Sequence, residues 1–308
     1  MTDRKPIVLI TGATGGIGRH AALHLAERGF HVIATGRNSQ NLASLASEAG
    51  AAGGDRLLTP LRLDVTDAAS IAGAAEAVDR LTGGRGIDVL VNNAGYGDMA
   101  PIEMISDADV RANYETNVFG LLAVTRAFLP AMRARGRGRI INVSSLGGIF
   151  TLPFYGVYNS TKYAVESLSN AMRVELRPLG IEVSIIEPGA IHTSFTSSSI
   201  ETGNKYQTPD SPYAQVLAHY TGLAKRLDRR APDPRVISKA IYHAAVSRRP
   251  RARYAVPRSA RLGIAVLRAL PTRWADAILR RVTRMDRKHL TAATVASGQL
   301  GTGGAPVT

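Results

Sequence analysis

The sequence predicts an α/β protein built on one doubly wound parallel sheet, in a single domain with a C-terminal helical extension. Short apolar runs alternate with helical segments, the connections between them are short, and a glycine-rich turn follows the first apolar run directly. Strands that alternate with helices in this way form parallel sheets covered on both faces. Right-handed crossovers then bring the carboxyl ends of the strands to one edge, where such sheets bind ligands.

Seven strands are expected from the alternation of strand-like and helical segments, and the first of them begins with an apolar run, Ile7 to Ile10, of the kind that is buried on both faces. The seven strands are residues 7–11, 30–35, 57–63, 87–91, 139–143, 181–187 and 252–256. Gly12, Asn92, Ser145 and Pro188 each follow one of these strands. We therefore expect these four residues to meet at the ligand-binding edge of the sheet.

The first strand leads into a turn that predicts a dinucleotide phosphate site. Residues 6–18 read Pro-Ile-Val-Leu-Ile-Thr-Gly-Ala-Thr-Gly-Gly-Ile-Gly, and a helix is expected over 19–28. The glycines let the backbone approach a pyrophosphate, and the amides of the helix N-terminus point at it. A glycine turn alone is weak evidence, but this strand, turn and helix together are what the Rossmann motif requires.

The end of the second strand, Thr35-Gly36-Arg37, bears on the choice of cofactor. NAD enzymes usually place an acidic residue here, roughly 20 residues past the glycines, to bind the ribose 2′-hydroxyl. A guanidinium instead suits a 2′-phosphate as a bidentate partner. The sequence thus favours NADP(H) over NAD(H), with a solvated loop arginine as the alternative reading of Arg37.

A serine, a tyrosine and a lysine predict acid–base chemistry. Tyr158 and Lys162 are four residues apart, so a helix puts them on one face, and Ser145 lies thirteen residues before Tyr158. A cation nearby favours the phenolate and is expected to lower the pKa of Tyr158 from its usual value of about 10. The set suits the interconversion of an alcohol and a carbonyl. Tyr-x-x-x-Lys alone would equally fit a pair on a surface helix.

Further motifs follow the other strands. Asp64-Val65 comes after the third strand and Asn92-Asn93-Ala94-Gly95 after the fourth, Asn117 lies in the next long helix, and Pro188-Gly189-x-Ile191-x-Thr193 follows the sixth. In this order the motifs resemble those of the short-chain dehydrogenase/reductase family over about residues 5–195. Asn-Asn-Ala-Gly-Tyr-Gly and the long C-terminal segment are similar to its hydroxysteroid and retinol dehydrogenase branch.

The resemblance implies functional roles for residues of these motifs. Ser145, Tyr158 and Lys162 would be catalytic, Asn117 would complete a proton relay, and Thr193 would bind the nicotinamide carboxamide. The cofactor-binding residues predicted in total are Thr11, Gly12, Thr14, Gly16, Ile17, Gly18, Arg37, Asp64, Val65, Asn93, Ala94, Gly95, Tyr158, Lys162, Pro188, Gly189, Ile191 and Thr193.

Composition narrows the class of protein. No run of 18 apolar residues occurs, so no transmembrane helix is expected, and the first strand begins too close to Met1 for a signal peptide. Without cysteine, disulfides and thiol nucleophiles are excluded, and the seven histidines show no clustered metal-ligand pattern. We expect a cytoplasmic protein without a metal site, and peripheral membrane contact stays open.

The segment after Ser145 predicts apolar walls around the reacting atoms. It contains Phe150, Leu152 and Phe154, and Tyr96 and Met99 follow the fourth strand. Apolar walls around one polar centre suit a lipophilic secondary alcohol or ketone, such as a steroid, a retinoid or a lipid. The alternative is that Phe150 and Leu152 belong to the core.

The basic charge is concentrated near the C-terminus. Residues 225–288 hold 19 Lys/Arg and 4 Asp/Glu, which accounts for the whole net charge of +14. Near 272–286, Trp274, Ile278 and Val282 recur at helical spacing among arginines. This apolar face either packs on the domain or on a partner subunit, or lies in an anionic membrane surface. Nucleic-acid binding has only the charge in its favour.

The domain prediction is a Rossmann-type dinucleotide-binding and catalytic domain over 1–257, with a substrate lid at about 193–224. A basic amphipathic extension follows over 258–290, and a disordered tail over 291–308. The predicted function is an NADP(H)-dependent oxidoreductase in which Tyr158 is the general acid/base, and a homo-oligomer is expected. A cofactor-sensing binding protein on the same fold, or a membrane-associated protein with a secondary enzymatic role, are the alternatives.

Overall fold

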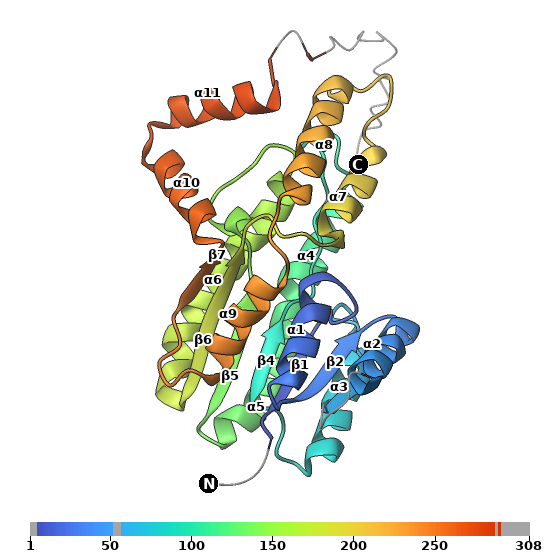
Figure 1. Cartoon of the computed structure of the whole chain (residues 1–308), viewed down its shortest axis with the longest axis vertical. Coiled ribbons are helices and arrows are strands. Elements are labelled where there is room, and N and C mark those ends of the chain that lie inside the picture. The colour runs from blue at the N-terminus through green and yellow to red at the C-terminus, as the bar shows by residue number, and fades with distance from the viewer. Residues whose placement is uncertain (1–4, 52–56, 287–288, 291–308) are drawn as a thin grey trace, which may run out of the picture.

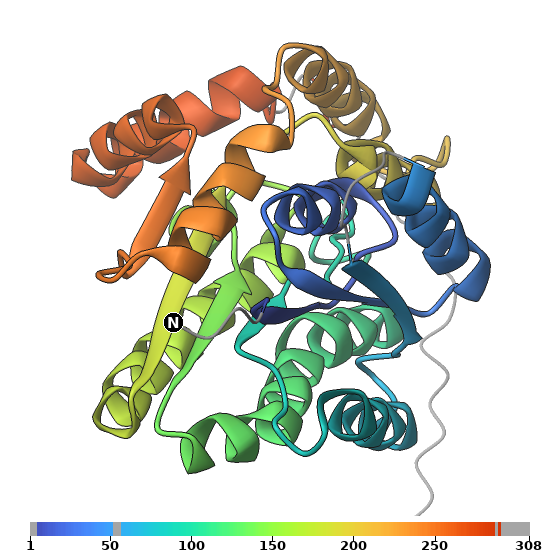
Figure 2. The same cartoon turned by 60° about the horizontal axis from the view of Figure 1, so that its bottom comes forward.

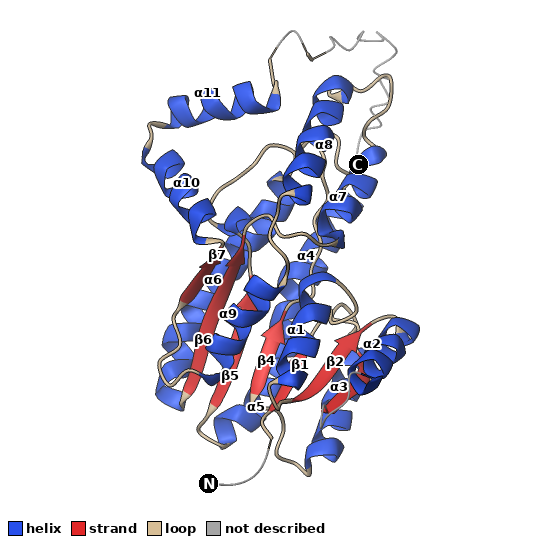
Figure 3. Ribbon diagram, in the orientation of Figure 1, coloured by secondary structure: helices blue, strands red, loops and turns tan. Residues whose placement is uncertain are grey.

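A parallel sheet of seven strands forms the centre of the computed structural model, which describes residues 5–51, 57–286 and 289–290 (Figure 3). The strand order is β3-β2-β1-β4-β5-β6-β7, and the predicted fold class is confirmed. Every predicted strand is present, with ends that differ by two residues at most. The strands are β1 Ile7–Ile10, β2 His31–Gly36, β3 Leu57–Arg62, β4 Val89–Asn92, β5 Gly138–Val143, β6 Ile181–Pro188 and β7 Arg253–Val256.

Helices cover both faces of the sheet, as Figures 1 and 2 show from two directions. One face carries α1 (Gly16–Glu27), α2 (Ser39–Ala51) and α9 (Arg235–Val246). The other carries α3 (Ala68–Thr82), α5 (Gly120–Ala134) and α6 (Gly156–Leu176). The strands between them are almost wholly buried from β1 to β6, except for β3 at the edge, which explains their continuous apolar runs.

The strand order reverses between β1 and β4, which are neighbours in the sheet. The chain runs outward from β1 to β3 and then crosses to the other side, so the connections after β1 and β4 diverge at their carboxyl ends. This switch point is where doubly wound sheets bind ligands. The loops after β1 and β4 carry the glycine turn and the Asn93-Ala94-Gly95 segment, respectively.

The remaining helices include four that lie beyond the carboxyl ends of the strands (Figure 1). They are α7 (Ser194–Asn204), α8 (Ala214–Arg229), α10 (Arg258–Ala269) and α11 (Thr272–Thr283). The others are α4 (Asp107–Tyr114), the π-helical turn η1 (Glu115–Phe119) and the 3₁₀ turns η2 (Leu146–Gly148) and η3 (Arg177–Leu179).

The predicted lid, 193–224, contains α7 and most of α8, and the predicted extension, 258–290, contains α10 and α11. The division into these parts stays a prediction, and the predicted tail, 291–308, lies outside the described residues. Among the described helices, none combines the length and the apolar character needed to span a bilayer.

Candidate active site

The glycine turn after β1 packs tightly against the loop after β4. Gly12 has a φ of +64°, and a Cβ atom on it would lie 2.9 Å from the Ala94 Cα. A Cβ on Gly18 would lie 2.3 Å from the Gly12 carbonyl oxygen and 2.4 Å from the Asn93 Nδ2. Only glycine fits at either position, so the turn keeps its backbone open along the edge of the sheet.

Hydrogen bonds fix the two loops to each other. The Asn93 Nδ2 donates to the carbonyl oxygens of Thr11 and Gly12 at 3.0 and 3.1 Å. The Thr11 hydroxyl accepts from the backbone N–H groups of Asn93 and Ala94, both at 3.0 Å. These contacts span about 80 residues of sequence and join the two sides of the switch point. The predicted residues Thr11, Gly12, Asn93 and Ala94 therefore come together.

The N-terminus of α1 fits an anionic group. Its N-cap residue, Gly15, has no side chain to accept from the first amides, and its first turn contains no acidic residue. Orphan amides together with the helix dipole attract phosphate. Gly16 lies next to Thr193, because a Cβ atom added to the glycine would be 3.6 Å from the Thr193 Cβ. Ile17 packs into the core beneath. The residues present thus fit a dinucleotide pyrophosphate.

The predicted adenosine end also lies along this edge. Thr14 packs against Gly36, where a Cβ would meet the Thr14 Cγ2 at 2.7 Å. Arg37 follows with an exposed side chain. Burial raises the pKa of Asp64, but hydrogen bonds from the backbone and hydroxyl of Thr66, together with the charges of Arg37 and Arg62, lower it overall. Val65 is buried, and its carbonyl lies against Gly120 of α5.

Ser145 follows β5 and Tyr158 lies in the first turn of α6, and the Ser145 hydroxyl is close enough to Tyr158 to act on its pKa. Ser145 is the N-cap of η2, and its Oγ accepts from the Gly147 N–H at 2.9 Å. Burial raises the pKa of Tyr158 to about 12, against a smaller lowering by the Ser145 hydroxyl. The sequence-based expectation of a lowered pKa is therefore wrong for this arrangement, and the phenol keeps its proton at neutral pH.

The position of Lys162 explains why the pKa of Tyr158 is raised rather than lowered. Its Nζ donates to the Val143 carbonyl oxygen at 3.0 Å and lies 5.8 Å from the centroid of the Tyr158 ring. Burial lowers the pKa of Lys162 to about 8, with Glu166 acting in the opposite direction. The ammonium thus lies beside the aromatic ring and is held by a backbone carbonyl, so it does little to offset the burial of the phenol.

Asn117 holds the segment in front of these residues. It lies in the π-helical turn η1, a deviation from α-helix that often marks functional sites. Its Nδ2 donates to the Tyr96 carbonyl oxygen and to the Thr161 hydroxyl, and its Oδ1 accepts from the Tyr96 N–H. Gly95 fits between Asn117 and Lys162, because a Cβ there would be 2.9 Å from the Asn117 Oδ1. Asn117 therefore links the loop after β4 to α6.

The segment after β6 completes the edge. The Pro188 carbonyl oxygen lies 3.5 Å from the Ser145 Oγ, and the Gly189 N–H donates to the Val256 carbonyl at 2.7 Å. Ile191 is buried in the core, and Thr193 caps α7 by accepting from the Phe195 N–H at 3.2 Å. The segments that carry the predicted site residues therefore meet at one edge of the sheet.

A buried ionic network behind Lys162 was missed by the sequence analysis. Arg253 of β7 forms an ion pair with Glu166 of α6, one turn beyond Lys162, and another with Glu187 of β6 at 2.6 Å. Both carboxylates are buried. Burial raises the pKa of Glu166, against the charge of Arg253. The only sequence signal was an acidic residue four positions after the lysine.

Aromatic and apolar side chains surround Tyr158. The ring of Phe195 lies 5.3 Å from its ring and that of Tyr155 lies 6.1 Å away, between centroids. Met99 and Phe154 are buried together with residues of α7 and α8, such as Ile200 and Leu217. The predicted apolar wall is thus partly present. Leu152 is exposed, so the alternative in which it belongs to the core is wrong.

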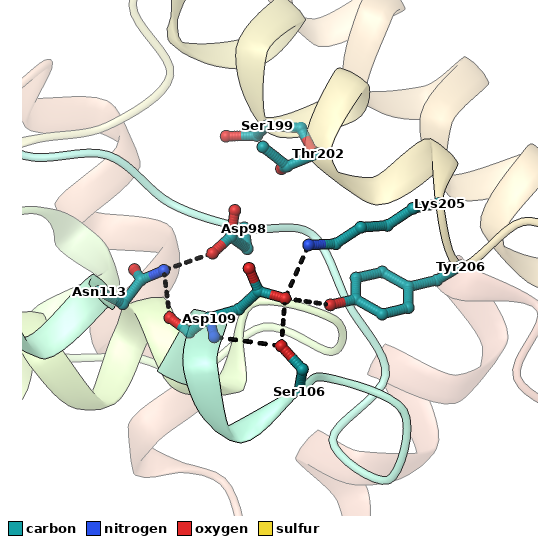
Figure 4. Close-up of polar contacts among 8 residues, drawn as sticks. All are labelled: Asp98, Ser106, Asp109, Asn113, Ser199, Thr202, Lys205 and Tyr206. Atoms are coloured by element: carbon teal, nitrogen blue, oxygen red, sulfur yellow. Dashed lines mark hydrogen bonds and ion pairs between the residues drawn. The ribbon is translucent and has the colours of Figure 1, made fainter. Parts of the chain in front are cut away.

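Two carboxylates make polar contacts around α4 (Figure 4). Asp98 is buried and accepts from the Asn113 Nδ2 of α4. Asp109 accepts from Lys205 and Tyr206, just beyond α7, at 2.7 and 3.0 Å. The two carboxylates thus join the loop after β4, α4 and the segment just beyond α7.

The two carboxylates have opposite pKa shifts, which predicts opposite mutational effects. Burial raises the pKa of Asp98, so its ionised form destabilises the fold above that pKa, and the penalty disappears as the pH falls. The hydrogen bond from Lys205 is the main cause that lowers the pKa of Asp109, so this group stabilises the fold at neutral pH and loses its effect in acid. At pH 7.5, Asp98→Asn should raise the melting temperature and Asp109→Asn should lower it.

Thermal denaturation of both variants between pH 4 and pH 8 tests this prediction. The Asp98→Asn difference should shrink as the pH falls through the raised pKa of Asp98, whereas the Asp109→Asn difference should stay nearly constant down to about pH 4, because the pKa of Asp109 is lowered. A lower melting temperature for Asp98→Asn at pH 7.5 would show that the ionised carboxylate is satisfied by its partners and stabilises the cluster.

A doubly wound sheet with a glycine turn at its switch point is the architecture of NAD(P)-dependent oxidoreductases. The family described as short chain dehydrogenase matches residues 6–204, and the chain belongs to this family of oxidoreductases acting on CH–OH groups.

Three similar proteins illustrate the range of the family. Human 17-beta-hydroxysteroid dehydrogenase type 1 is 36% identical over 81% of this chain and 77% of its own length. The 3-ketodihydrosphingosine reductase of Bacteroides thetaiotaomicron is 34% identical over 76% of this chain and 81% of its own. A serine dehydrogenase solved in a closed form with NADP⁺ is 31% identical, with a TM-score of 0.67, and the match covers 81% of this chain and 94% of that one.

Proposed function

We propose that this protein is an NADP(H)-dependent oxidoreductase that transfers a hydride between nicotinamide and a lipophilic secondary alcohol or ketone. The observation that carries the proposal is the placement of Ser145, Tyr158 and Lys162 together, with the Lys162 Nζ 5.8 Å from the centroid of the Tyr158 ring and the rings of Phe195 and Tyr155 beside it. The names of two relatives, which refer to a hydroxysteroid and a ketodihydrosphingosine, support a steroid- or lipid-like substrate.

Each polar group has a defined role in this chemistry. The bound nicotinamide would supply or accept the hydride. In reduction, Tyr158 donates its proton to the carbonyl oxygen of the substrate, and its raised pKa keeps it in the acid form. The Ser145 hydroxyl donates to the same oxygen as negative charge develops there. Lys162 provides a buried positive charge beside the phenol, and Asn117 holds the loop that carries Gly95.

A panel of ketones assayed with NADPH and NADH in parallel tests the proposed reaction. We expect turnover with polycyclic and long-chain ketones, and little with short hydrophilic ones, because the side chains near Tyr158 are apolar. Binding of NADP(H) without turnover of any member of the panel would favour the alternative of a cofactor-sensing protein. The intact Ser145, Tyr158 and Lys162 set argues against that alternative.

Arg37 is the residue on which the preference for NADP(H) rests. Its side chain is exposed directly after β2, beside the Thr14–Gly36 contact that ends the glycine turn. Arg37→Asp should repel a 2′-phosphate and offer an acceptor to the ribose 2′-hydroxyl. A charge-assisted hydrogen bond contributes roughly 1.5–3 kcal/mol, so the ratio of kcat/KM for NADPH over NADH should fall at least ~10-fold.

The control is Arg133→Asp, which makes the same change of charge at an exposed position near the end of α5. That end of α5 precedes β5, so it lies at the opposite edge of the sheet from the site. The ratio for this control should match the wild type. An unchanged ratio in Arg37→Asp would show that Arg37 is a solvated loop residue.

A further inference from the structure

The two C-terminal helices expose large apolar side chains. Leu262 and Val266 of α10, and Trp274, Ile278 and Val282 of α11, are all exposed, and the exposed fractions of Leu262 and Trp274 are 70% and 66%. Amphipathic helices of globular proteins normally turn such side chains towards the core. The sequence left open whether this face packs on the domain. Such packing explains the partial burial of residues such as Leu279, but it does not cover these five side chains.

The exposed stripe of α11 is held in a fixed orientation. Trp274, Ile278 and Val282 recur every four residues and so share one side of the helix. The C-terminal end of α11 is attached to the lid, because the His219 ring of α8 contacts the Val282 carbonyl at 3.3 Å and Met285 packs on the apolar cluster under α8. Thr283 is buried at the same end. The helix thus has an attached side and a free apolar side.

Positive charge accompanies this apolar stripe. Arg273, Arg280, Arg281 and Arg284 are exposed on α11 and its C-cap, whereas the helix contains one acidic residue, Asp276. Within the part of the chain that the structure describes, none of the four arginines forms an ion pair. Exposed cations beside exposed apolar side chains are the chemistry of a helix that lies in an anionic membrane surface.

The position of the two helices fits such a surface. Figure 1 shows α10 and α11 beyond the carboxyl ends of the strands, at the same end of the molecule as α7 and α8. The candidate site opens towards that end, since its residues follow the strands. A surface held by α10 and α11 would therefore lie near the lid, where a lipophilic substrate would enter.

We propose that α10 and α11 dock this protein on an anionic lipid bilayer. Trp274, Ile278 and Val282 enter the boundary between headgroups and acyl chains, and the arginines bind the headgroup phosphates and carboxylates. A second copy of the chain fits this face less well, because it would bring two strongly basic segments together. Nucleic acid would satisfy the arginines but leave the apolar stripe exposed. The idea that docking delivers a lipophilic substrate rests on the proposed function, whereas the proposal of docking does not depend on it.

Co-sedimentation of the full chain with vesicles tests the proposal without any measurement of turnover. The vesicles contain phosphatidylcholine alone or with about one third phosphatidylglycerol, at low and at roughly 0.5 M salt. We expect binding to the anionic vesicles that weakens as salt shortens the Debye length. Replacing both Arg280 and Arg281 by glutamine should lower the partition coefficient at least ~10-fold, since each basic residue near the surface contributes about 1 kcal/mol.

Glutamate substitutions separate insertion from charge attraction. Trp274→Glu and Ile278→Glu should each lower the partition coefficient at least ~10-fold, because each places a charge on the inserting face and removes apolar area. The matched control is Leu81→Glu on α3. This leucine is 47% exposed, and α3 covers a face of the sheet and is not part of the proposed docking surface. Equal melting temperatures of the variants establish that they are folded.

Four results would overturn the proposal: no binding to anionic vesicles at low salt, equal binding to neutral vesicles, binding unaffected by Trp274→Glu, or an equal loss with Leu81→Glu. Two further results, each without vesicle binding, would also overturn the proposal. A dimer that Trp274→Glu dissociates would assign the face to a second copy of the chain, and retention of DNA would assign it to nucleic acid. If the protein bound anionic vesicles but turned over no ketone of the panel, only the proposed function would be refuted.

Discussion

Tyr158→Phe is expected to lower kcat at least ~10²-fold, the usual scale for loss of a general acid, with little change in the affinity for NADP(H). The substitution keeps the ring that packs against Phe195 and Tyr155 and removes only the hydroxyl, the group on which Ser145 acts. Because the phenol carries the proton to be transferred, the loss should fall on the chemical step rather than on binding. Steady-state kinetics with the best ketone of the panel, together with calorimetric titration of NADP(H), measures both quantities.

Tyr155→Phe is the matched control. Tyr155 is three residues earlier, its ring centroid lies 6.1 Å from that of Tyr158, and its hydroxyl acts with Ser199 of α7 rather than with Ser145. It should therefore affect kcat far less than Tyr158→Phe. Near-wild-type turnover by Tyr158→Phe, or a larger loss in Tyr155→Phe, would refute the assignment of Tyr158 as the proton donor.

The parts of the fold that the sequence predicted well are those with local signals. A buried parallel strand is a continuous apolar run, and the turn after β1 is marked by glycines whose absent Cβ atoms leave room for neighbouring backbone. The placement of the site followed from topology alone, because the carboxyl ends of parallel strands share an edge. Even Asn117, which the resemblance supplied, gains a physical reason only from its contacts with Tyr96 and Thr161.

Contacts that depend on register and burial could not be predicted. The pairing of Arg253 with Glu166 and Glu187 joins residues that are 87 and 66 positions apart, and the Asp109–Lys205 pair joins residues 96 positions apart. The pKa of Tyr158 was mispredicted for a related reason. Spacing on a helix places Lys162 near the ring, but it does not reveal that the Val143 carbonyl holds the ammonium or that burial dominates.

Gly18→Ala is expected to abolish tight binding of NADP(H) and to lower the free energy of unfolding by roughly 1–3 kcal/mol, the usual cost of overpacking. Alanine is the better helix former by about 1 kcal/mol, which would stabilise α1. The added Cβ, however, would lie 2.3 Å from the Gly12 carbonyl oxygen and 2.4 Å from the Asn93 Nδ2. Relief of these contacts has to move the turn or break the hydrogen bonds of Asn93, and the steric term outweighs the helix propensity.

Two other glycines isolate the steric cause. Gly73→Ala lies inside α3 with no atom within 4 Å of the new Cβ, so it should stabilise the protein by up to about 1 kcal/mol through helix propensity. Gly15→Ala lies in the same turn as Gly18, with extended backbone and its nearest atom, the Ser194 Oγ, 4.0 Å away. It should cost at most about 1 kcal/mol as a poorer N-cap and leave the affinity for NADP(H) close to the wild type.

Chemical denaturation measures the free energy of unfolding of the three variants, and calorimetric titration measures their affinity for NADP(H). If Gly15→Ala weakened NADP(H) binding as much as Gly18→Ala, any side chain in the turn would be harmful, and the close approach of Gly18 to Gly12 and Asn93 would not be the cause. If Gly18→Ala bound normally, the turn would not hold the dinucleotide at all. The opposite signs expected for Gly18→Ala and Gly73→Ala follow only from the crowding at the switch point, because both replace a helical glycine by the same residue.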